Sequence, residues 1–431
     1  MKLNKLSTIG MSIIPVFLLT PLVVTSCSSS NNVKSNEISY KWLKNITKEI
    51  PNRVATLENN EEKASKWIIQ KLELLGYKNI NLSKNQRIEN ELPINESTCS
   101  KVQINQNKIA YYNAIHIDQQ NNDLNFNGFF DTKYYWKNKD QKYNSQNIML
   151  NILSSKENAK DVFLVSHYDT ANNKNDGTND NSSGLAVNLA IAEYFSNSNN
   201  LSKLNVNIHI LFASAEEQGI IGTNVFVDRF IKSNQRIKDK TLWMINLDSV
   251  AGGDILYVHS PDTTASQVEW NTDSQIRDQI NQISKNKLII HPQIDPNGFK
   301  KGETGDWSDH APFYKNGIKV AYIESTNFNI KGKDGFDGYS QTINPYYWKK
   351  ASGSIVGLEK QTKEIDGQNI NLYIPSNYSN LINDKTFTSW GRLWHMDDDV
   401  LDKYEENFPG RLQEQMKIVF DTLIKFIESQ K

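Results

Sequence analysis

Residues that could bind a metal ion follow several apolar segments of this sequence. In "LFASAEEQGIIGT" an apolar run ends in Glu216 and Glu217 and leads into a glycine-containing turn. Two adjacent carboxylates at the end of a buried strand are unfavourable unless a cation or a proton compensates them. Four more segments carry similar groups: His167 and Asp169 in "SHYDT", Asp180 in "NDNSSG", Asp248 in "NLDSV", and His395 and Asp399 in "HMDDD".

Each of these residues alone also has an ordinary structural interpretation. A single histidine is more often a core or surface residue than a ligand, and Asp180 could cap the helix predicted from residue 182. Asp248 could begin a loop, and residues 397–399 could be a solvated acidic stretch. In an open α/β sheet, however, ligands bind at the carboxyl ends of the strands. Because the pattern recurs at five strand ends, it indicates one shared site.

The chemical types of these groups favour zinc. Two imidazoles and three or four carboxylates, without a thiolate, suit zinc, with cobalt or manganese as substitutes. One catalytic zinc ion usually takes three protein ligands and a water, so the carboxylates are too numerous for one ion. They suit two ions bridged by a carboxylate and a water. The expected cofactor is therefore two Zn2+ ions per chain, with Co2+ or Mn2+ as possible substitutes.

Alternating strands and helices must position these residues. Apolar runs predict strands, and apolar residues at helical spacing predict helices. The predicted strands span residues 146–153, 161–166, 205–213, 242–247 and 319–324, and the predicted helices span 38–50, 59–77, 182–195 and 409–429. This alternation favours an α/β fold, a three-layer α/β/α sandwich around a central, mostly parallel (mixed) sheet.

Two polar segments interrupt this alternation. Residues 89–143 are rich in Asn and Tyr, and residues 328–388 mix Gly, Lys and aromatic residues. Neither segment shows a strong core pattern of its own. We therefore expect both to be loop-rich insertions within one domain, residues 38–431.

The first residues have the features of an export signal. Lys2 and Lys5 precede an apolar stretch, residues 13–24, that is too short for a comfortable transmembrane helix. The sequence "VTSC" resembles a bacterial lipobox ending at Cys27. We expect a signal peptide over residues 1–27, a lipid anchor on Cys27, a flexible tether over residues 28–37 and a location on the outer face of the cell membrane. An ordinary secretory signal is the alternative.

The composition argues against several other classes of protein. A formal net charge of -1 gives no basic surface for nucleic acid. Cys99 is the one cysteine besides Cys27, so the chain has neither an internal disulfide nor a thiolate metal site. The composition predicts no particular oligomeric state.

The motifs, taken in order, resemble those of the co-catalytic di-zinc exopeptidases. This family includes secreted bacterial leucyl aminopeptidases, aminopeptidase Y, glutamate carboxypeptidases and glutaminyl cyclases. The resemblance covers most of the chain from about residue 38, apart from the two insertions, and rests on "SHYDT", "NDNSSG", "AEEQGIIGT", "NLDSV", "GDWSDHAPF" and "LWHMDDDVLDKY". It implies a fold of the zinc-peptidase type. It also implies that His167 and Asp248 hold one zinc, Glu217 and His395 the other, that Asp180 bridges both, and that Glu216 and Asp169 serve catalysis.

The implied roles of the last two residues differ. Glu216 is the general base, whereas Asp169 is a carboxylate behind His167 that orients the imidazole. His310 competes with His395 for the last ligand position. In the family pattern the histidine of the Ser-Asp-His stretch lines the pocket, and the last ligand lies in a later His-x-x-x-Asp stretch. The resemblance thus favours His395, and the expected substrate-pocket residues are Asp309, His310 and Asp399. Where the family commonly has Thr, this chain has Met396 and Val400.

The resemblance implies a membrane-anchored zinc exopeptidase, most closely an aminopeptidase that acts on peptides. A hydroxide bridging the metals would attack the peptide carbonyl, and Glu216 would pass the proton to the leaving amine. A carboxypeptidase, a glutaminyl cyclase and a non-catalytic peptide-binding lipoprotein remain alternatives. Cyclases of this family usually manage with one zinc and altered ligands, and a binding protein could lose Glu216. This chain keeps the full set.

Overall fold

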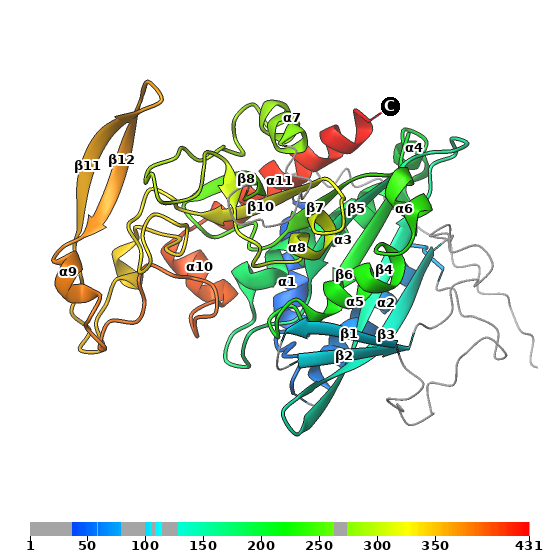
Figure 1. The fold of residues 1–431 in the computed structure, drawn as a ribbon, viewed down its shortest axis with the longest axis horizontal. Helices are drawn as coiled ribbons and strands as arrows, with labels where there is room; N and C mark the ends of the chain where they lie inside the picture. The colour runs from blue at the N-terminus through cyan, green and yellow to red at the C-terminus, as the bar shows by residue number, and fades with distance from the viewer. Residues whose placement is uncertain are drawn as a thin grey trace, which may run out of the picture. The chain divides into compact units, whose positions relative to one another are not determined.

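One mixed sheet forms the centre of the protein in its computed structural model (Figure 1). The structure describes residues 37–57, 59–78, 100–105, 108–113, 128–262 and 274–430. Across the sheet the strands are β1 (Ser100–Asn105), β2 (Lys108–Asn113), β3 (Gly128–Asn138), β4 (Gln141–Ile152), β6 (Asn207–Ala213), β5 (Asp161–His167), β7 (Thr241–Leu247), β10 (Val320–Thr326), β8 (Ile255–Pro261) and β9 (Glu303–Thr304).

The parallel strands lie in the middle of this sheet. β5 pairs in parallel with β6 on one side and with β7 on the other, and β7 pairs in parallel with β10. The neighbours β4 and β8 run antiparallel to this group. The mixed sheet with β5 at its centre confirms the predicted fold class. It also brings the carboxyl ends of four adjacent strands to one edge.

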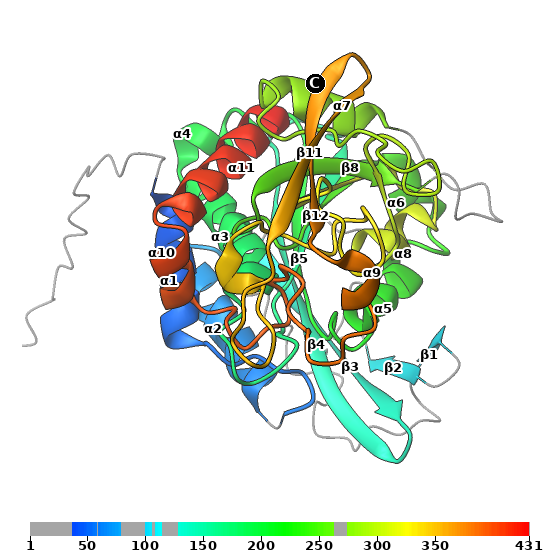
Figure 2. The same ribbon diagram turned by 90° about the vertical axis from the view of Figure 1, so that its left-hand side faces the viewer.

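Helices cover both faces of the sheet, and Figure 2 shows the two layers on either side of β5. One face carries α1 (Ile38–Glu49), α2 (Asn60–Leu74), α3 (Ser183–Ser196), α7 (Gln275–Ile283) and α11 (Arg411–Glu428). The other carries α5 (Ile221–Phe230), α6 (Gln235–Lys240) and α8 (His310–Tyr314). The shorter elements are η1 (Thr178–Ser182), α4 (Ser198–Leu201), η2 (Pro345–Tyr347), α9 (Tyr378–Leu381) and α10 (Leu401–Asn407).

The apolar pattern explains this layering. Every residue of β5 and of β6 is buried, because both faces of these strands are covered by helices. Helix α3 is apolar nearly all round and packs against α1 and α11, whereas α11 buries one stripe of side chains and exposes the other. The predicted strands and helices agree with the observed ones to within a few residues, except that β4 begins earlier.

The first predicted insertion proved to be part of the sheet. Its described residues form β1, β2, β3 and the first part of β4, which pair antiparallel in that order. Tyr112, Tyr134 and Trp136 pack with Val225 of α5 in a core of their own. The expectation of a loop-rich segment does not hold for these described residues, which form strands. Their aromatic residues stand side by side among Lys and Asn, so no period-2 alternation marks the strands in the sequence.

The second predicted insertion lies outside the sheet but has a small core. It carries the hairpin of β11 (Leu358–Ile365) and β12 (Gln368–Pro375), drawn in orange in Figure 1. The core comprises Ile330, Trp348, Val356, Leu381, Phe387 and Trp390. This small core lies in a segment whose sequence shows no strong core pattern. Widely spaced aromatic residues form the core, so no local period reveals it.

The N-terminal predictions lie outside the described residues. These are the signal peptide, the tether up to residue 36 and the anchor on Cys27, as well as the position of Cys99. Among the helices that are described, we find none with both the length and the apolar character needed to cross a membrane.

Candidate metal centre

Three adjacent strands end at the predicted site residues. His167 is the last residue of β5, Asp248 follows β7 directly, and Glu216 and Glu217 lie in the turn after β6. Because β5 lies between β6 and β7 with parallel pairing to both, these side chains share one edge of the sheet. This edge is where open α/β sheets bind ligands.

Asp180 comes from η1, the turn that leads into α3. The backbone N–H groups of Asn179 and Asp180 donate to the two carboxylate oxygens of Asp399, at 2.7 and 3.1 Å. In the first turn of α3, a Cβ added to Gly184 would lie 2.2 Å from the carbonyl oxygen of Leu247. A glycine is therefore required where α3 begins against the end of β7.

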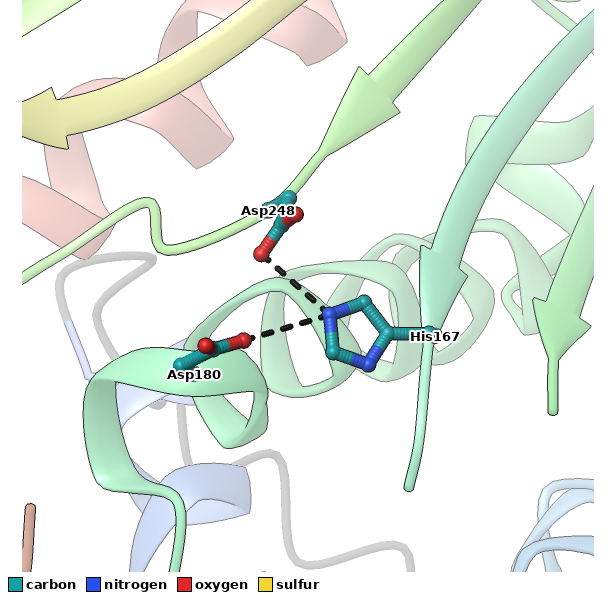
Figure 3. Close-up of side chains that lie close together, drawn as sticks. All are labelled: His167, Asp180 and Asp248. Atoms are coloured by element: carbon teal, nitrogen blue, oxygen red, sulfur yellow. Dashed lines mark hydrogen bonds and ion pairs between the residues drawn. The ribbon is translucent and has the colours of Figure 1, made fainter. Parts of the chain in front are cut away.

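His167, Asp180 and Asp248 form the first group of candidate ligands (Figure 3). His167 Nε2 lies 3.2 Å from Asp180 Oδ1 and 3.3 Å from Asp248 Oδ1, and all three residues are buried. One ring nitrogen has a single hydrogen or lone pair, so it cannot satisfy two carboxylates directly. Two carboxylate oxygens that converge on one imidazole nitrogen are instead typical of ligands around a shared cation.

Asp180, Glu217 and His395 form the second group. His395 Nε2 lies 2.6 Å from Glu217 Oε2 and 3.3 Å from Asp180 Oδ2. Asp180 therefore presents one oxygen to each group. The side chain of His395 is 37% exposed, whereas that of Glu217 is 4% exposed, so this group opens to solvent on the His395 side. The structure brings His395, rather than His310, to Asp180.

The buried carboxylates shift the pKa values of the groups around them. Burial raises the pKa of Glu217 to about 7 and raises that of Glu216 well above its ordinary value. Burial opposes the charge of His395 too, but hydrogen bonds with Asp180 and Glu217 raise its pKa to about 10. Burial would likewise raise the pKa of Asp180, yet hydrogen bonds from His167 and His395 lower it. The site thus strongly favours positive charge.

Both groups fit a zinc ion. Two atoms bound at 2.0–2.1 Å to a tetrahedral ion lie roughly 3.3 Å apart, close to three of the four nitrogen–oxygen separations within the two groups. Each group offers one imidazole and two carboxylates, which leaves a fourth position for water. Glu217 Oε1 is buried and makes no hydrogen bond with any residue that the structure describes. An unpaired buried carboxylate oxygen is costly, and a cation would compensate it.

Two residues fix the candidate ligands from behind. Asp169 Oδ1 lies 3.4 Å from His167 Nδ1, and the carboxylate accepts the N–H groups of Glu216 and Glu217 at 3.1 and 3.2 Å. Ser308 Oγ donates to Asp248 Oδ2 at 2.7 Å. Asp169 is fully buried and does not line the cavity, a position that suits the expected carboxylate behind His167. Sequence reasoning missed Ser308, although it belongs to the quoted Ser-Asp-His stretch.

Arg53 is a second residue that sequence reasoning missed. Its fully buried guanidinium donates to the carbonyl oxygens of Tyr168 and Asp176 and to Ser182 Oγ, at 2.5 to 3.0 Å. It thereby ties β5 to the turn that carries Asp180. Burial lowers the pKa of Arg53 to about 10, so the group stays charged at neutral pH. A lone arginine in a loop is usually exposed, and nothing in the surrounding sequence signals this role.

Strained backbone surrounds the site. Ala215, Ser249 and His395 have φ values of 51°, 54° and 60°, although none is a glycine. Such conformations cost on the order of 1 kcal/mol each and persist where neighbouring groups fix them. Glu61 Oε1 accepts the N–H of Ala215 at 3.0 Å, and the carbonyl of Ser249 accepts the N–H of Ser325 at 2.8 Å. Glu61 is thus a third supporting residue that sequence reasoning missed.

A cavity of about 490 Å³ adjoins both groups. Glu216 lies on its wall beside Glu217 and is 9% exposed. Aromatic side chains form another part of the wall, namely Trp307, Tyr339 and Trp394. Of these, Trp307 lies in the stretch "GDWSDHAPF", and Tyr339 lies in the second insertion.

The structure corrects the predicted substrate-pocket residues, because Asp309, His310 and Asp399 do not line this cavity. All three are buried supports. His310 Nε2 lies 2.9 Å from a backbone carbonyl, and its ring stacks on Tyr322 with centroids 4.8 Å apart. Asp309 accepts the hydroxyl of Thr223 at 2.5 Å, and Asp399 holds the turn that carries Asp180. The family pattern correctly indicated that these residues lie near the site, but it did not indicate whether they are exposed to the cavity.

Comparisons with protein families and relatives agree with this geometry. The model for peptidase family M28 matches residues 147–419, which is well over half of the chain and spans both groups of candidate ligands. The alkaline phosphatase isozyme conversion protein of Escherichia coli (strain K12) is 28% identical over 232 residues. That match covers 49% of this chain and 64% of the relative, so the chain spans less than two thirds of the relative's length.

Solved structures share the fold at low sequence identity. A glutaminyl cyclase from an Acidobacteriales bacterium is 14% identical with a TM-score of 0.50, and the match covers 92% of this chain and 96% of that one. BSAP, a zinc aminopeptidase from Bacillus subtilis, is 15% identical with a TM-score of 0.48, over 91% and 94% of the two chains. At 14% identity the likeness to the cyclase structure supports the fold alone.

Proposed function

The chain belongs to peptidase family M28 and is a zinc metallopeptidase, and from this premise we propose that it is an aminopeptidase that works with two zinc ions. One observation carries the proposal. The two carboxylate oxygens of Asp180 face different imidazoles, Oδ1 toward His167 and Oδ2 toward His395. A carboxylate with one oxygen in each of two ligand groups is suited to bridge two ions.

We propose that His167 and Asp248 hold one ion, that Glu217 and His395 hold the other, and that Asp180 binds both. Two zinc ions bound there supply a water of lowered pKa and a Lewis acid for the scissile carbonyl. Glu216 takes the proton of the attacking water and delivers it to the leaving amine. Burial raises the pKa of Glu216, which makes its protonated form a competent acid for that second step.

The charges of the cavity favour an N-terminal substrate. Carboxylates line it, whereas no Lys or Arg is found among the described residues of its wall. A carboxypeptidase needs a positive group for the C-terminal carboxylate, and an aminopeptidase needs acceptors for the free amine. The cavity therefore suits a free α-amino group, and the carboxypeptidase alternative lacks an anchor for its substrate.

The glutaminyl cyclase remains a second candidate because one solved relative of the same fold is such an enzyme. Two observations support hydrolysis instead. The second group of candidate ligands lies beside the first, and Glu216 lies on the cavity wall next to both groups, as the proposed general base requires. A peptide-binding protein without activity would require neither.

A panel of peptides tests this proposal. Zinc-loaded protein should release the first residue of peptides with a free N-terminus and leave N-acetylated versions of the same peptides intact. Release of C-terminal residues would replace the aminopeptidase with a carboxypeptidase. Conversion of N-terminal Gln to pyroglutamate without hydrolysis would identify a cyclase. Binding of peptides without any product would leave the lipoprotein alternative.

We also propose that the enzyme is held on the outer face of the cell membrane by a lipid on Cys27. The lipobox-like sequence that ends at this residue supports the proposal. Detergent phase separation of the expressed protein is the test. Wild type should enter the detergent phase, and Cys27→Ser should stay in the aqueous phase. Equal partitioning of both forms would contradict the anchor.

A further inference from the structure

Two carboxylates on the cavity wall belong to neither group of candidate ligands. Glu324 lies on β10 two residues after Tyr322, and both side chains reach the cavity because alternate residues of a strand share a face. Asp337 lies in the second insertion and lines the same cavity. The proposed mechanism uses neither carboxylate, so their presence calls for a separate explanation.

Glu324 has no cationic partner within the described part of the protein. Its Oε2 accepts the hydroxyl of Tyr322 at 3.3 Å. Its Oε1 lies 2.9 Å from His259 Nε2 but makes no aligned hydrogen bond, and it is buried. Burial lowers the pKa of His259 to about 3 and raises that of Glu324 to about 8, so this neutral histidine does not stabilise a charge on the glutamate. The side chain of Glu324 is 12% exposed, and it faces the cavity as a buried acceptor that lacks a positive partner.

Asp337 adds a second acceptor to the same wall. Its carboxylate accepts the N–H of Tyr339 at 3.0 Å, and no Lys or Arg pairs with it among the described residues. Burial raises its pKa, and the negative charges of Asp334 and Glu324 raise it further. Burial and nearby negative charge thus disfavour the ionised form of both carboxyl groups, and a cation held beside them would stabilise that form.

The aromatic wall suits a cation on an apolar stem. Tyr339 and Trp394 meet edge to face at 5.5 Å. The guanidinium of Arg392 already lies over both rings, at 5.5 Å from Tyr339 and 4.7 Å from Trp394, but this arginine does not line the cavity. Rings of this kind bind guanidinium and ammonium groups on their faces. Trp307, which is 47% exposed, offers a further ring at the cavity.

We propose that Glu324 and Asp337 select substrates whose N-terminal residue is arginine or lysine. The side chain of that residue lies along the aromatic wall, and its cationic end meets the two carboxylates. This selectivity rests on the proposed aminopeptidase function, since it assigns the substrate class of the same cavity. Charge-assisted hydrogen bonds of this kind distinguish a cationic side chain from a neutral one of equal size.

The test compares aminoacyl anilides of arginine, citrulline, lysine and leucine on the zinc-loaded enzyme. Citrulline matches arginine in shape but carries no charge. A hydrogen bond to a charged group strengthens binding by about 10- to 100-fold. We therefore expect kcat/KM for the arginine anilide to exceed that for the citrulline anilide by about this factor. Glu324→Gln and Asp337→Asn should each lower the value for arginine at least about 5-fold and leave that for citrulline within about twofold.

A matched control removes one charge from the same segment. Asp334 is exposed and does not line the cavity, so Asp334→Asn should keep the preference for arginine. Equal rates on arginine and citrulline in the wild type would overturn the proposal. An equal loss of kcat/KM on all four substrates in both cavity variants would also overturn it. That result would mean that the two carboxylates bind the α-amino group, which all four substrates share.

Failure of the aminopeptidase function itself gives a different result, namely no cleavage of any anilide. Calorimetric binding of argininamide and citrullinamide to the same zinc-loaded protein then decides the matter without turnover. Tighter binding of argininamide that Glu324→Gln removes would support the acidic pocket. Equal binding of the two amides would overturn it.

Discussion

The two groups of candidate ligands differ in how the fold holds them. In the first group His167 is the last residue of β5 and Asp248 follows β7, and all three residues are almost fully buried. The second group depends on His395, which lies in a loop after the second insertion and is 37% exposed. Asp180 is common to both. One group is thus built into the sheet, and the other is completed by a segment from the far end of the chain.

The loop of His395 has its own attachments. Asn175 Nδ2 donates to the carbonyl oxygen of Met396 at 2.8 Å, and Asn172 Nδ2 reaches that of His395 at 3.5 Å. These are side-chain hydrogen bonds near the surface, whereas the ladder of β5 is buried. Loops held in this way open at lower free energy than a sheet core. We therefore expect the metal of the second group to exchange faster than that of the first.

The largest effect is expected at the residue that both groups share. In Asp180→Asn, each group loses a charged ligand, so zinc content should fall at both positions and peptidase activity should drop to background. Metal analysis and anilide hydrolysis on the same sample measure the two effects. A variant that keeps both metals and measurable activity would show that Asp180 does not bridge them.

The next effect separates chemistry from metal binding. Glu216→Gln removes the proposed base but no candidate ligand, so we expect kcat to fall about 100- to 10,000-fold while zinc content stays at the wild-type value. A fall in zinc content would instead assign Glu216 to the ligands. Activity equal to that of the wild type would contradict its role as the base.

The contrast between the groups predicts unequal losses of stability. Zinc at about 100 times its dissociation constant stabilises a protein by about 2.7 kcal/mol per site. With saturating zinc, His395→Ala should keep the stabilisation that comes from zinc in the buried first group. His167→Ala should lose this stabilisation, which we expect to be larger than that from the second group. Thermal unfolding with and without zinc measures both. Asp397→Asn, an exposed neighbour that pairs with Lys174, is the control and should match the wild type. Equal losses in the two histidine variants would remove the contrast.

The smallest effect concerns His310, which lies behind the cavity wall. Its Nε2 donates to Gly305 O, Nδ1 faces the Asn246 amide at 3.5 Å, and burial lowers its pKa to about 4. An unfolded histidine titrates near 6.5. Between these two values the unfolded chain binds the extra proton and the folded chain does not, so stability falls as the pH falls. The contribution of His310 is about 1.4 kcal/mol per pH unit.

Urea unfolding of metal-free protein at pH 7, 6 and 5 measures this slope. His310→Gln keeps a polar side chain but does not titrate, so its free energy of unfolding should fall less on acidification than that of the wild type. Removing the metal from both proteins excludes acid release of zinc as the cause. If the free energy of unfolding changed with pH equally in the two proteins, His310 would not have a lowered pKa in the folded state. This result would contradict the prediction.

The fold was predictable where the apolar period was strong. The runs of β5, β6 and β7 and the stripe of α11 gave their elements directly, because burial dictates those residues. The strands β1, β2 and β3 were missed because polar residues interrupt them, so that they show neither a long apolar run nor a strict alternation. The core around Trp348 and Trp390 was missed because its residues are far apart in the sequence, and only the tertiary fold brings them together.

The same limit applies to the site. Strand-end position and residue type singled out His167, Asp180, Glu217, Asp248 and His395, and the structure brings these five together. Supports such as Arg53 and Glu61 carry no local signal, since their importance comes from burial beside a distant turn. The cavity wall was misassigned for this reason too. Whether Asp309 or Glu324 faces the cavity depends on packing that no motif encodes.

A zinc titration of the metal-free wild-type protein tests the shared role of Asp180 most directly. We predict two zinc ions per chain at saturation, with one bound more tightly than the other, as the buried and half-open groups require. Competition with a chelator of known affinity gives both the number of ions and their order of release. Saturation at one zinc per chain would contradict the two-metal centre, whatever activity the protein shows.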